Sequence, residues 1–444
     1  MREARALLAV AAAVLAVAAG GLLASPPPAR SQAPDVLLNV MASGAKRLNI
    51  FIPDFTVVAG ADPGALARRV PEVAGADLKF SALFSVVSDP APLPVGDAEA
   101  LRQRWSGAAA AGAHAALHGL LSLGATRATA EMRLYDLTSP ELRLIATKKL
   151  DMPVADGRRL AHKIADEVLF QFTGEPGIAD TRIAYVAGPP GAKELYLVDY
   201  DGAGPLPLTA NRSVNLSPAW SPDSRSVAFT SYLGGYPFLY RLFAFERRPV
   251  QLLAGHLGIN SSPAWSPDGR SVALTLSKDG NPEIYVLTVA TGAFRRLTTH
   301  SGIDTEPSWS PTGREIAFTS DRAGPAQIFV MDAEGANVRR LTRGGFNTQP
   351  RWSPRGDTIV YTSRQGNHDL WAVSPDGSHA RRLTAGPGDN ESASWAPNGR
   401  HLAFHSSRLR GSRIFTMLAD GSEQQPMPTQ GGEATSPAWS PRLP

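Results

Sequence analysis

Six copies of a short phrase, Trp-x-Pro, recur in the second half of the chain and constrain its fold more than any other feature. Successive Trp residues are 45, 44, 43, 43 and 44 positions apart, at Trp220, Trp265, Trp309, Trp352, Trp395 and Trp439. A period near 44 residues, with turn residues at fixed offsets, is typical of a β-propeller in which each repeat forms one four-stranded blade. Six phrases therefore predict six blades.

The rest of each repeat has the pattern of strands. A turn such as Asp268-Gly269 follows the Pro, and an apolar second strand such as 272–274 follows the turn. The third strand alternates aromatic and aliphatic residues, and the short fourth strand usually ends in Leu-Thr. Runs of period two between Gly, Pro and Asp clusters indicate strands and not helices.

The strand types also predict how the ring closes. The first copy of the second-type strand, Ile183-Ala184-Tyr185, precedes every Trp phrase, whereas Trp439 lies five residues from the C-terminus. Segment 436–439 is therefore expected to supply the missing first strand of the blade that begins at Ile183. Such closure removes two open sheet edges, so deletion of the last eight residues is expected to damage the whole propeller.

The N-terminus has the form of an export signal. Arg2 and Arg5 precede an uncharged stretch at 6–24, and we assign residues 1–33 to a signal peptide, with the cleavage site left open. The stretch is also just long enough for an uncleaved membrane anchor, which is the alternative. The 444-residue chain has a net charge of +4 and no cysteine, which fits export and excludes disulfides and thiolate metal sites.

A mixed α/β domain is predicted at 34–174, before the propeller. Its expected strands are 36–41, 48–55, 115–122, 127–137 and 142–151, and its expected helices are 62–77, 97–112 and 156–172. The last helix has apolar residues at i, i+4, i+8 and i+12, the period of an amphipathic helix. A linker at 175–182 and a six-bladed propeller at 183–444 complete the predicted organisation.

Catalytic motifs are missing from the sequence. No Gly-x-Ser-x-Gly elbow, no cysteine nucleophile and no Gly-rich phosphate loop is present, and the nine His residues lack the spacing of a zinc helix. We therefore expect no enzyme activity, no cofactor and no metal. Arg pairs recur in successive fourth strands, and we interpret them as charges on the outer rim of the propeller. Such spread pairs do not form one continuous track for phosphates, so no nucleic acid is expected as a partner.

A polar residue recurs five positions before each Trp, where the loop enters the innermost strand. These residues are Asn215, Asn260, Asp304, Asn347 and Asn390, and Ala434 breaks the pattern in the last repeat. Further polar residues lie beside them: Ser262, Thr305, Glu306, Thr348, Gln349 and Glu391. We interpret the set as a polar propeller mouth that receives a partner. The alternative is that Asn and Asp side chains simply satisfy backbone groups in a repeated turn.

The order of these parts resembles the TolB family, the periplasmic propeller component of the Tol-Pal system. The segments that carry the resemblance are the junction at 160–168 and 181–186, the segment 199–202 and the terminal 437–441. The resemblance implies a non-enzymatic, monomeric periplasmic adaptor that supports outer-membrane integrity and constriction during cell division. It would bind the peptidoglycan-associated lipoprotein Pal at the propeller mouth and the inner-membrane protein TolA through its N-terminal segment.

The resemblance also implies which residues bind each partner. Thr305-Glu306-Pro307 and Asn260-Ser261-Ser262-Pro263 match loops that face Pal, so changes at Thr305 or Glu306 are expected to weaken Pal binding without lowering the melting temperature. Segment 35–45 matches a switch that is either ordered or released, with TolA contacts at Asp35, Val36, Leu37, Leu38, Asn39 and Val40. The alternative function is an exported propeller that binds or modifies a small ligand in its central channel.

Overall fold

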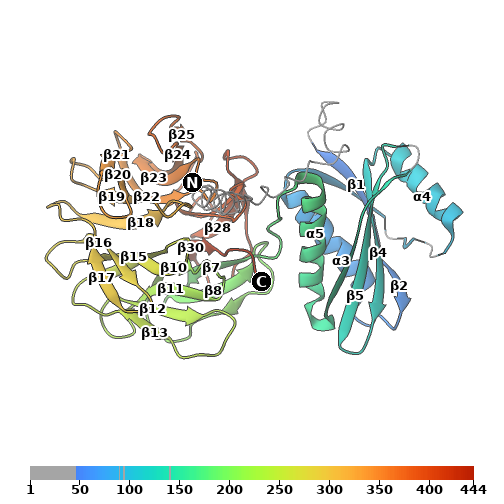
Figure 1. Cartoon of the computed structure of the whole chain (residues 1–444), viewed down its shortest axis with the longest axis horizontal. Coiled ribbons are helices and arrows are strands. Elements are labelled where there is room, and N and C mark those ends of the chain that lie inside the picture. The colour runs from blue at the N-terminus through green and yellow to red at the C-terminus, as the bar shows by residue number, and fades with distance from the viewer. Residues whose placement is uncertain (1–46, 90, 94–95, 140–141) are drawn as a thin grey trace, which may run out of the picture.

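The computed structural model describes residues 47–89, 91–93, 96–139 and 142–444. The predicted signal peptide, the predicted strand 36–41 and the predicted TolA-binding residues lie outside these ranges. An α/β domain and a propeller lie side by side, and helix α5 (Gly157–Thr173) occupies the side of the α/β domain that faces the propeller (Figure 1).

The α/β domain is built on one mixed sheet with the strand order β3-β1-β4-β5-β6, and β2 pairs with β4 beside it. Strand β1 runs parallel to β3 and β4, whereas β4, β5 and β6 are antiparallel. The strands are β1 (Leu48–Pro53), β2 (Thr56–Ala59), β3 (Phe84–Asp89), β4 (Ala115–Leu123), β5 (Arg127–Asp136) and β6 (Leu144–Pro153). The predicted strand 48–55 is thus interrupted, because the Phe55 N–H leaves the sheet and donates to the Ala67 carbonyl.

Helices cover both faces of this sheet. Helices α3 (Leu66–Phe80) and α5 pack on the face to which Ile50 points, and α4 (Ala98–Ala110) covers the opposite face through Phe51 and Trp105. A short 3₁₀ turn (Val154–Asp156) precedes α5. Helix α3 begins four residues later than predicted, because the Asp62 carboxylate accepts hydrogen bonds from the backbone of Leu66 and Ala67.

Six four-stranded antiparallel sheets form the propeller, which confirms the predicted fold. Five of the blades are each built from four consecutive strands. The first three of these are β10 (Asn215–Trp220), β11 (Ser226–Ser231), β12 (Phe238–Phe243) and β13 (Gln251–Ala254); β14 (Asn260–Trp265), β15 (Ser271–Leu276), β16 (Glu283–Thr288) and β17 (Ala293–Arg296); and β18 (Asp304–Trp309), β19 (Glu315–Ser320), β20 (Gln327–Asp332) and β21 (Arg339–Arg340). The next two are β22 (Phe346–Trp352), β23 (Ile359–Gln365), β24 (Asn367–Val373) and β25 (Arg381–Arg382); and β26 (Asn390–Trp395), β27 (His401–Ser406), β28 (Arg413–Leu418) and β29 (Gln425–Pro426).

The sixth blade joins both ends of the propeller segment. Its order is β30 (Ala434–Trp439), β7 (Arg182–Ala187), β8 (Glu194–Asp199) and β9 (Leu206–Pro207). Trp439 lies opposite Ile183 in the register, and its indole N–H donates to the Thr181 hydroxyl at 2.8 Å. The predicted closure by the last strand of the chain is therefore confirmed.

Candidate functional site

The two ends of the propeller differ in what covers them. Strands alternate in direction within a blade, so the loops that enter first strands share one face with the loops between second and third strands. The α/β domain packs against the other set of loops: Arg400 lies between β26 and β27, Glu423 between β28 and β29, and Tyr200 between β8 and β9. We call that end the docked face and the opposite end the free face.

The five repeated Asn and Asp side chains lie at the free face but beneath its surface. Each is at most 2% exposed: Asn215, Asn260, Asp304, Asn347 and Asn390. Three of them donate through the side-chain amide to an acid or amide at the start of the preceding blade's third strand. These pairs are Asn215 with Glu194 at 3.0 Å, Asn347 with Gln327 at 2.9 Å and Asn390 with Asp369 at 3.0 Å.

The remaining two side chains are also engaged. Asn260 donates to the His256 and Gly258 carbonyls of its own loop. The Asp304 carboxylate accepts from Arg322 at 2.6 Å, and burial raises its pKa although Arg322 opposes the shift. These five residues therefore hold the loops in place, as the alternative interpretation of the turn predicted, and in this conformation their side chains are not accessible to a partner.

The repeated Leu-Thr completes this network. In four blades the Thr hydroxyl accepts from the backbone N–H that directly follows an acid or amide residue of the third strand, as Thr298 does from the Ile284 N–H at 2.9 Å. The same hydroxyl donates to the acid or amide one residue earlier, and Thr384 reaches Asp369 at 2.8 Å. In three blades the repeated Thr, the acid or amide of the third strand and the Asn of the next blade thus form one buried cluster, although they lie apart in the sequence.

A second repeated feature lies inside the channel. Every inner strand has a bulge, and the residue three positions before its Trp has a positive φ of 49° to 56°: Ser217, Ser262, Glu306, Gln349, Ser392 and Ser436. Glu306 accepts from the Gln349 backbone N–H at 2.8 Å and from Thr319 at 2.9 Å, and the Gln349 side chain accepts from the Ser392 N–H at 3.0 Å. Glu306 and Gln349 therefore fasten successive blades together.

Three other predicted mouth residues are partly exposed on the inner strands: Thr305, Thr348 and Glu391. Glu391 pairs with His405 at 3.2 Å, and this hydrogen bond lowers the pKa of the carboxyl group although burial opposes it. Of the predicted set, these three side chains and that of Ser262, which is also partly exposed, have surface available for contact without the bridging role of Glu306 and Gln349.

The free face also carries exposed apolar side chains that the sequence analysis did not include. They are Tyr232 (43% exposed), Leu233 (50%), Tyr236 (55%), Leu257 (76%), Ile259 (39%), Ile303 (47%), Phe346 (39%) and Leu409 (49%). A repeat alignment contains the signal for part of this set, because Ile259, Ile303 and Phe346 each directly precede the repeated Asn or Asp. Scattered exposed apolar residues are ordinary, but these eight all belong to the loops and strand ends of one end of the propeller.

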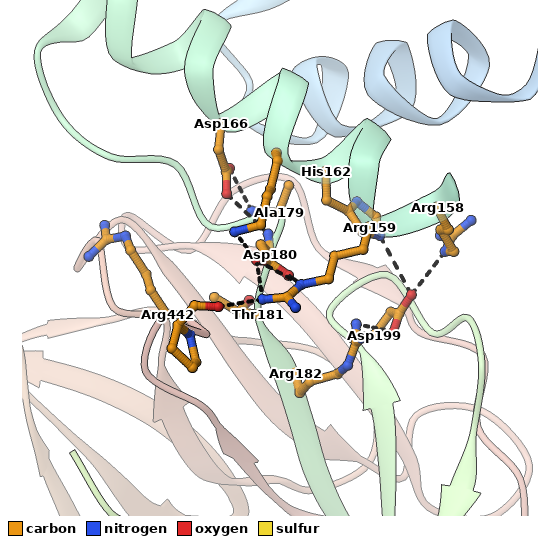
Figure 2. Close-up of polar contacts among 12 residues, drawn as sticks. Arg158, Arg159, His162, Asp166, Ala179, Asp180, Thr181, Arg182, Asp199 and Arg442 are labelled. Carbon is orange, nitrogen blue, oxygen red and sulfur yellow. Dashed lines mark hydrogen bonds and ion pairs between the residues drawn. The ribbon is translucent and has the colours of Figure 1, made fainter. Parts of the chain in front are cut away.

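The junction between the domains is the second polar centre. Figure 2 shows Arg158, Arg159, His162 and Asp166 projecting from α5 toward the start of the propeller. Arg159 binds Asp180 through two nitrogens, at 3.0 and 3.1 Å. The predicted linker at 175–182 is thus buried in part, and residues 178–181 are at most 5% exposed.

Two residues of α5 have shifted pKa values at this junction. His162 is fully buried, with Nδ1 at 2.7 Å from Asp77 Oδ2 and Nε2 at 3.5 Å from Asp199 Oδ2. Burial alone would lower the pKa of His162, but Asp199 and Asp77 outweigh it and raise the pKa to about 9. Burial raises the pKa of Asp166 to about 6, even though its carboxylate accepts from the backbone of Ala179 and Asp180.

Neither centre has the form of a metal site: within the described ranges, no three His, Cys, Asp or Glu side chains are grouped to hold an ion. No helix among those same residues is long and apolar enough to cross a membrane.

Comparisons with known proteins agree with this architecture. Residues 170–443 match the family model of the TolB β-propeller domain, and residues 36–142 match that of the TolB amino-terminal domain. A crystal structure of TolB from Acinetobacter baumannii is similar, with 28% identity and a TM-score of 0.77 over 89% of this chain and 97% of that one.

Curated relatives are similar over a shorter stretch. The Tol-Pal system protein TolB of Geobacter sulfurreducens is 40% identical over 46% of this chain and 47% of its own length, and that of Desulfosudis oleivorans is 37% identical over the same shares. The chain thus spans about half the length of the curated relatives it matches. With the propeller model matched over more than half of its residues, the chain belongs to the TolB family.

Proposed function

We propose that this chain is a non-enzymatic periplasmic adaptor of the Tol-Pal system, which binds a Pal-like lipoprotein on its free face. The observation that carries this proposal is the set of eight exposed apolar residues on the free face, the end that the α/β domain leaves uncovered. Apolar anchors surrounded by polar residues are the usual energetic centre of a protein interface. Thr305, Thr348 and Glu391, which are partly exposed on the inner strands, supply polar contacts beside these apolar residues.

The N-terminal segment is the proposed site for a TolA-like inner-membrane protein. The family membership supports this second partner, and the contact residues proposed at 35–40 precede the first described strand. The two partners would then bind different parts of the chain. A pulldown from envelope extract, with the mature chain and with a variant that lacks residues 35–45, tests this arrangement. Both should recover the Pal-like lipoprotein, and only the longer chain should recover the TolA-like protein.

A matched pair of substitutions tests the free face directly. Ile303 and Val338 belong to the same blade and are 47% and 39% exposed, but Ile303 lies on the free face and Val338 lies in the loop between β20 and β21 on the docked face. Ile303→Lys should weaken binding of the purified Pal-like domain at least tenfold in calorimetric titration, and Val338→Lys should not. Equal affinities for both variants would move the interface away from this face.

A further inference from the structure

A cavity of about 460 Å³ lies in the central channel at the level of the Trp-x-Pro phrases. All six repeats line it with Trp, Pro, Ala and Ser side chains, and the one charged residue among its lining residues is Arg351. Its volume is within the range of roughly 300–1,000 Å³ that small-molecule sites occupy. Solvent reaches Arg351, which is only partly buried.

Arg351 is an exception to the repeat. It directly precedes Trp352, and the residues that precede the other five Trp are all small: Ala219, Ala264, Ser308, Ser394 and Ala438. The ring therefore closes without a long cationic side chain at this position. An arginine here adds a guanidinium group to the channel wall, and packing of the neighbouring blades does not require it.

The guanidinium has no anionic partner in the described part of the chain. Its Nη1 donates a hydrogen bond to the Pro350 carbonyl at 2.9 Å. Burial lowers the pKa of Arg351, and Glu306, which is already bonded to Thr319 and Gln349, opposes this shift only in part. A guanidinium stays charged in proteins and offers five N–H donors, so most donors of this cavity-lining residue have no hydrogen-bond acceptor within the described residues.

Two hydroxyl groups flank Arg351 at the same level of the channel. Ser308 and Ser394, from the blades on either side, accept the backbone N–H groups of Trp352 and Trp439 at 3.0 and 2.9 Å. Each hydroxyl hydrogen is then available for donation. Donors therefore gather on one side of the channel, whereas the three Ala of the remaining blades make the other side apolar.

We propose that this cavity binds a small organic carboxylate, with its carboxylate on Arg351 and its apolar body against the Trp, Pro and Ala wall. Guanidinium and carboxylate groups match in a bidentate geometry, and the two serines can donate to the same oxygens. A single cation among apolar walls favours a monoanion with a hydrophobic body over inorganic phosphate. The cavity lies apart from the free face, so the test of carboxylate binding does not depend on whether the chain binds a Pal-like protein.

The test uses the mature chain, with benzoate as the probe and inorganic phosphate for comparison. Arg351→Ser installs the residue that two neighbouring repeats carry, so the fold should persist and the melting temperature should not fall. Arg343→Ser removes an exposed arginine from the loop that leads into the same blade and is the matched control for charge. Tryptophan fluorescence and calorimetric titration follow binding, because six indoles lie at the cavity.

The proposal expects saturable benzoate binding to the wild type and to Arg343→Ser, with at least tenfold weaker binding to Arg351→Ser. Failure of the wild type to bind benzoate would overturn it, as would equal benzoate affinities of the wild type and Arg351→Ser. Phosphate binding as tight as benzoate binding, and equally lost in Arg351→Ser, would overturn the assignment to an organic carboxylate.

Discussion

His162 shows how one buried residue can hold two domains through its charge. Its imidazolium lies between carboxylates of α3 and β8, at Asp77 and Asp199. His162→Asn removes the positive charge and leaves both carboxylates buried without it, so we expect a loss of about 3 kcal/mol in the free energy of unfolding at pH 7. Urea titration measures this loss, and His300→Asn, at an exposed histidine, should change little.

The pH dependence of that loss follows from the direction of the shift. The pKa of His162 is raised from 6.5 to about 9 in the folded chain, so its contribution is full below about pH 6.5 and disappears as the pH rises through 9. The stability difference between wild type and His162→Asn should therefore be larger at pH 6 than at pH 10. A difference that stays constant over this interval would mean that folding does not shift the pKa of His162, and a difference that grows as the pH rises would mean that folding lowers it.

Glu306 requires a revision of the expectation from sequence. Its carboxylate accepts the Gln349 N–H of the next blade at 2.8 Å, and the Thr319 hydroxyl accepts the same N–H at 3.2 Å. Glu306→Ala therefore removes the shorter of two hydrogen bonds and should cost about 1 kcal/mol. Glu306→Gln retains one acceptor oxygen and should cost less. Thermal unfolding of the two variants distinguishes them. If Glu306→Ala melts at the wild-type temperature, Glu306 is free for partner contact, as first expected.

At the scale of elements, strand β30 carries the closure of the ring. Deletion of 437–444 removes half of β30 together with Trp439, and it exposes the edge of β7. We expect loss of the cooperative thermal transition and aggregation in size-exclusion chromatography, because an unpaired edge recruits other chains. Removal of Pro444 alone costs one hydrogen bond from Arg159 and should preserve the transition. A monodisperse, cooperative deletion variant would contradict this role of β30.

The sequence predicted elements better than contacts, and particular residues explain why. The Trp spacing is a pattern along the chain, and so is the second-type strand at Ile183 that has no first-type strand before it. The number of blades and the closure of the ring could therefore be predicted from them. The burial of Asn390 was not predictable, because it depends on Asp369, which belongs to a different blade. The linker prediction at 175–182 rested on Gly and Pro content, whereas Arg159 and Asp166 of α5 hold that segment in place.

At the scale of the whole molecule, the two domains share one hydrophobic core. A single cluster of buried residues includes Ile50 of the α/β sheet, Ile164 of α5 and Trp439 of the last blade. Phe80 of α3 also stacks on His401 of the propeller, with ring centroids 5.0 Å apart. Such an interface favours a fixed arrangement of the domains over free relative motion. Any coupling between the free face and the α/β domain must therefore pass through the blades.

A shared core predicts that both domains unfold together. The wild type should show one calorimetric transition, whereas Arg159→Ala combined with Asp166→Ala should separate it into two, because the hydrogen bonds of Arg159 and Asp166 to residues 179–180 are lost and the ion pair of Lys163 with Asp180 remains as the polar contact of α5 with these two residues. The matched control is Arg127→Ala with Asp151→Ala, which removes an exposed ion pair within the α/β domain and should leave one transition. Two transitions in the wild type would show that the core does not couple the domains, and the arrangement of α5 on the propeller would then be one of several.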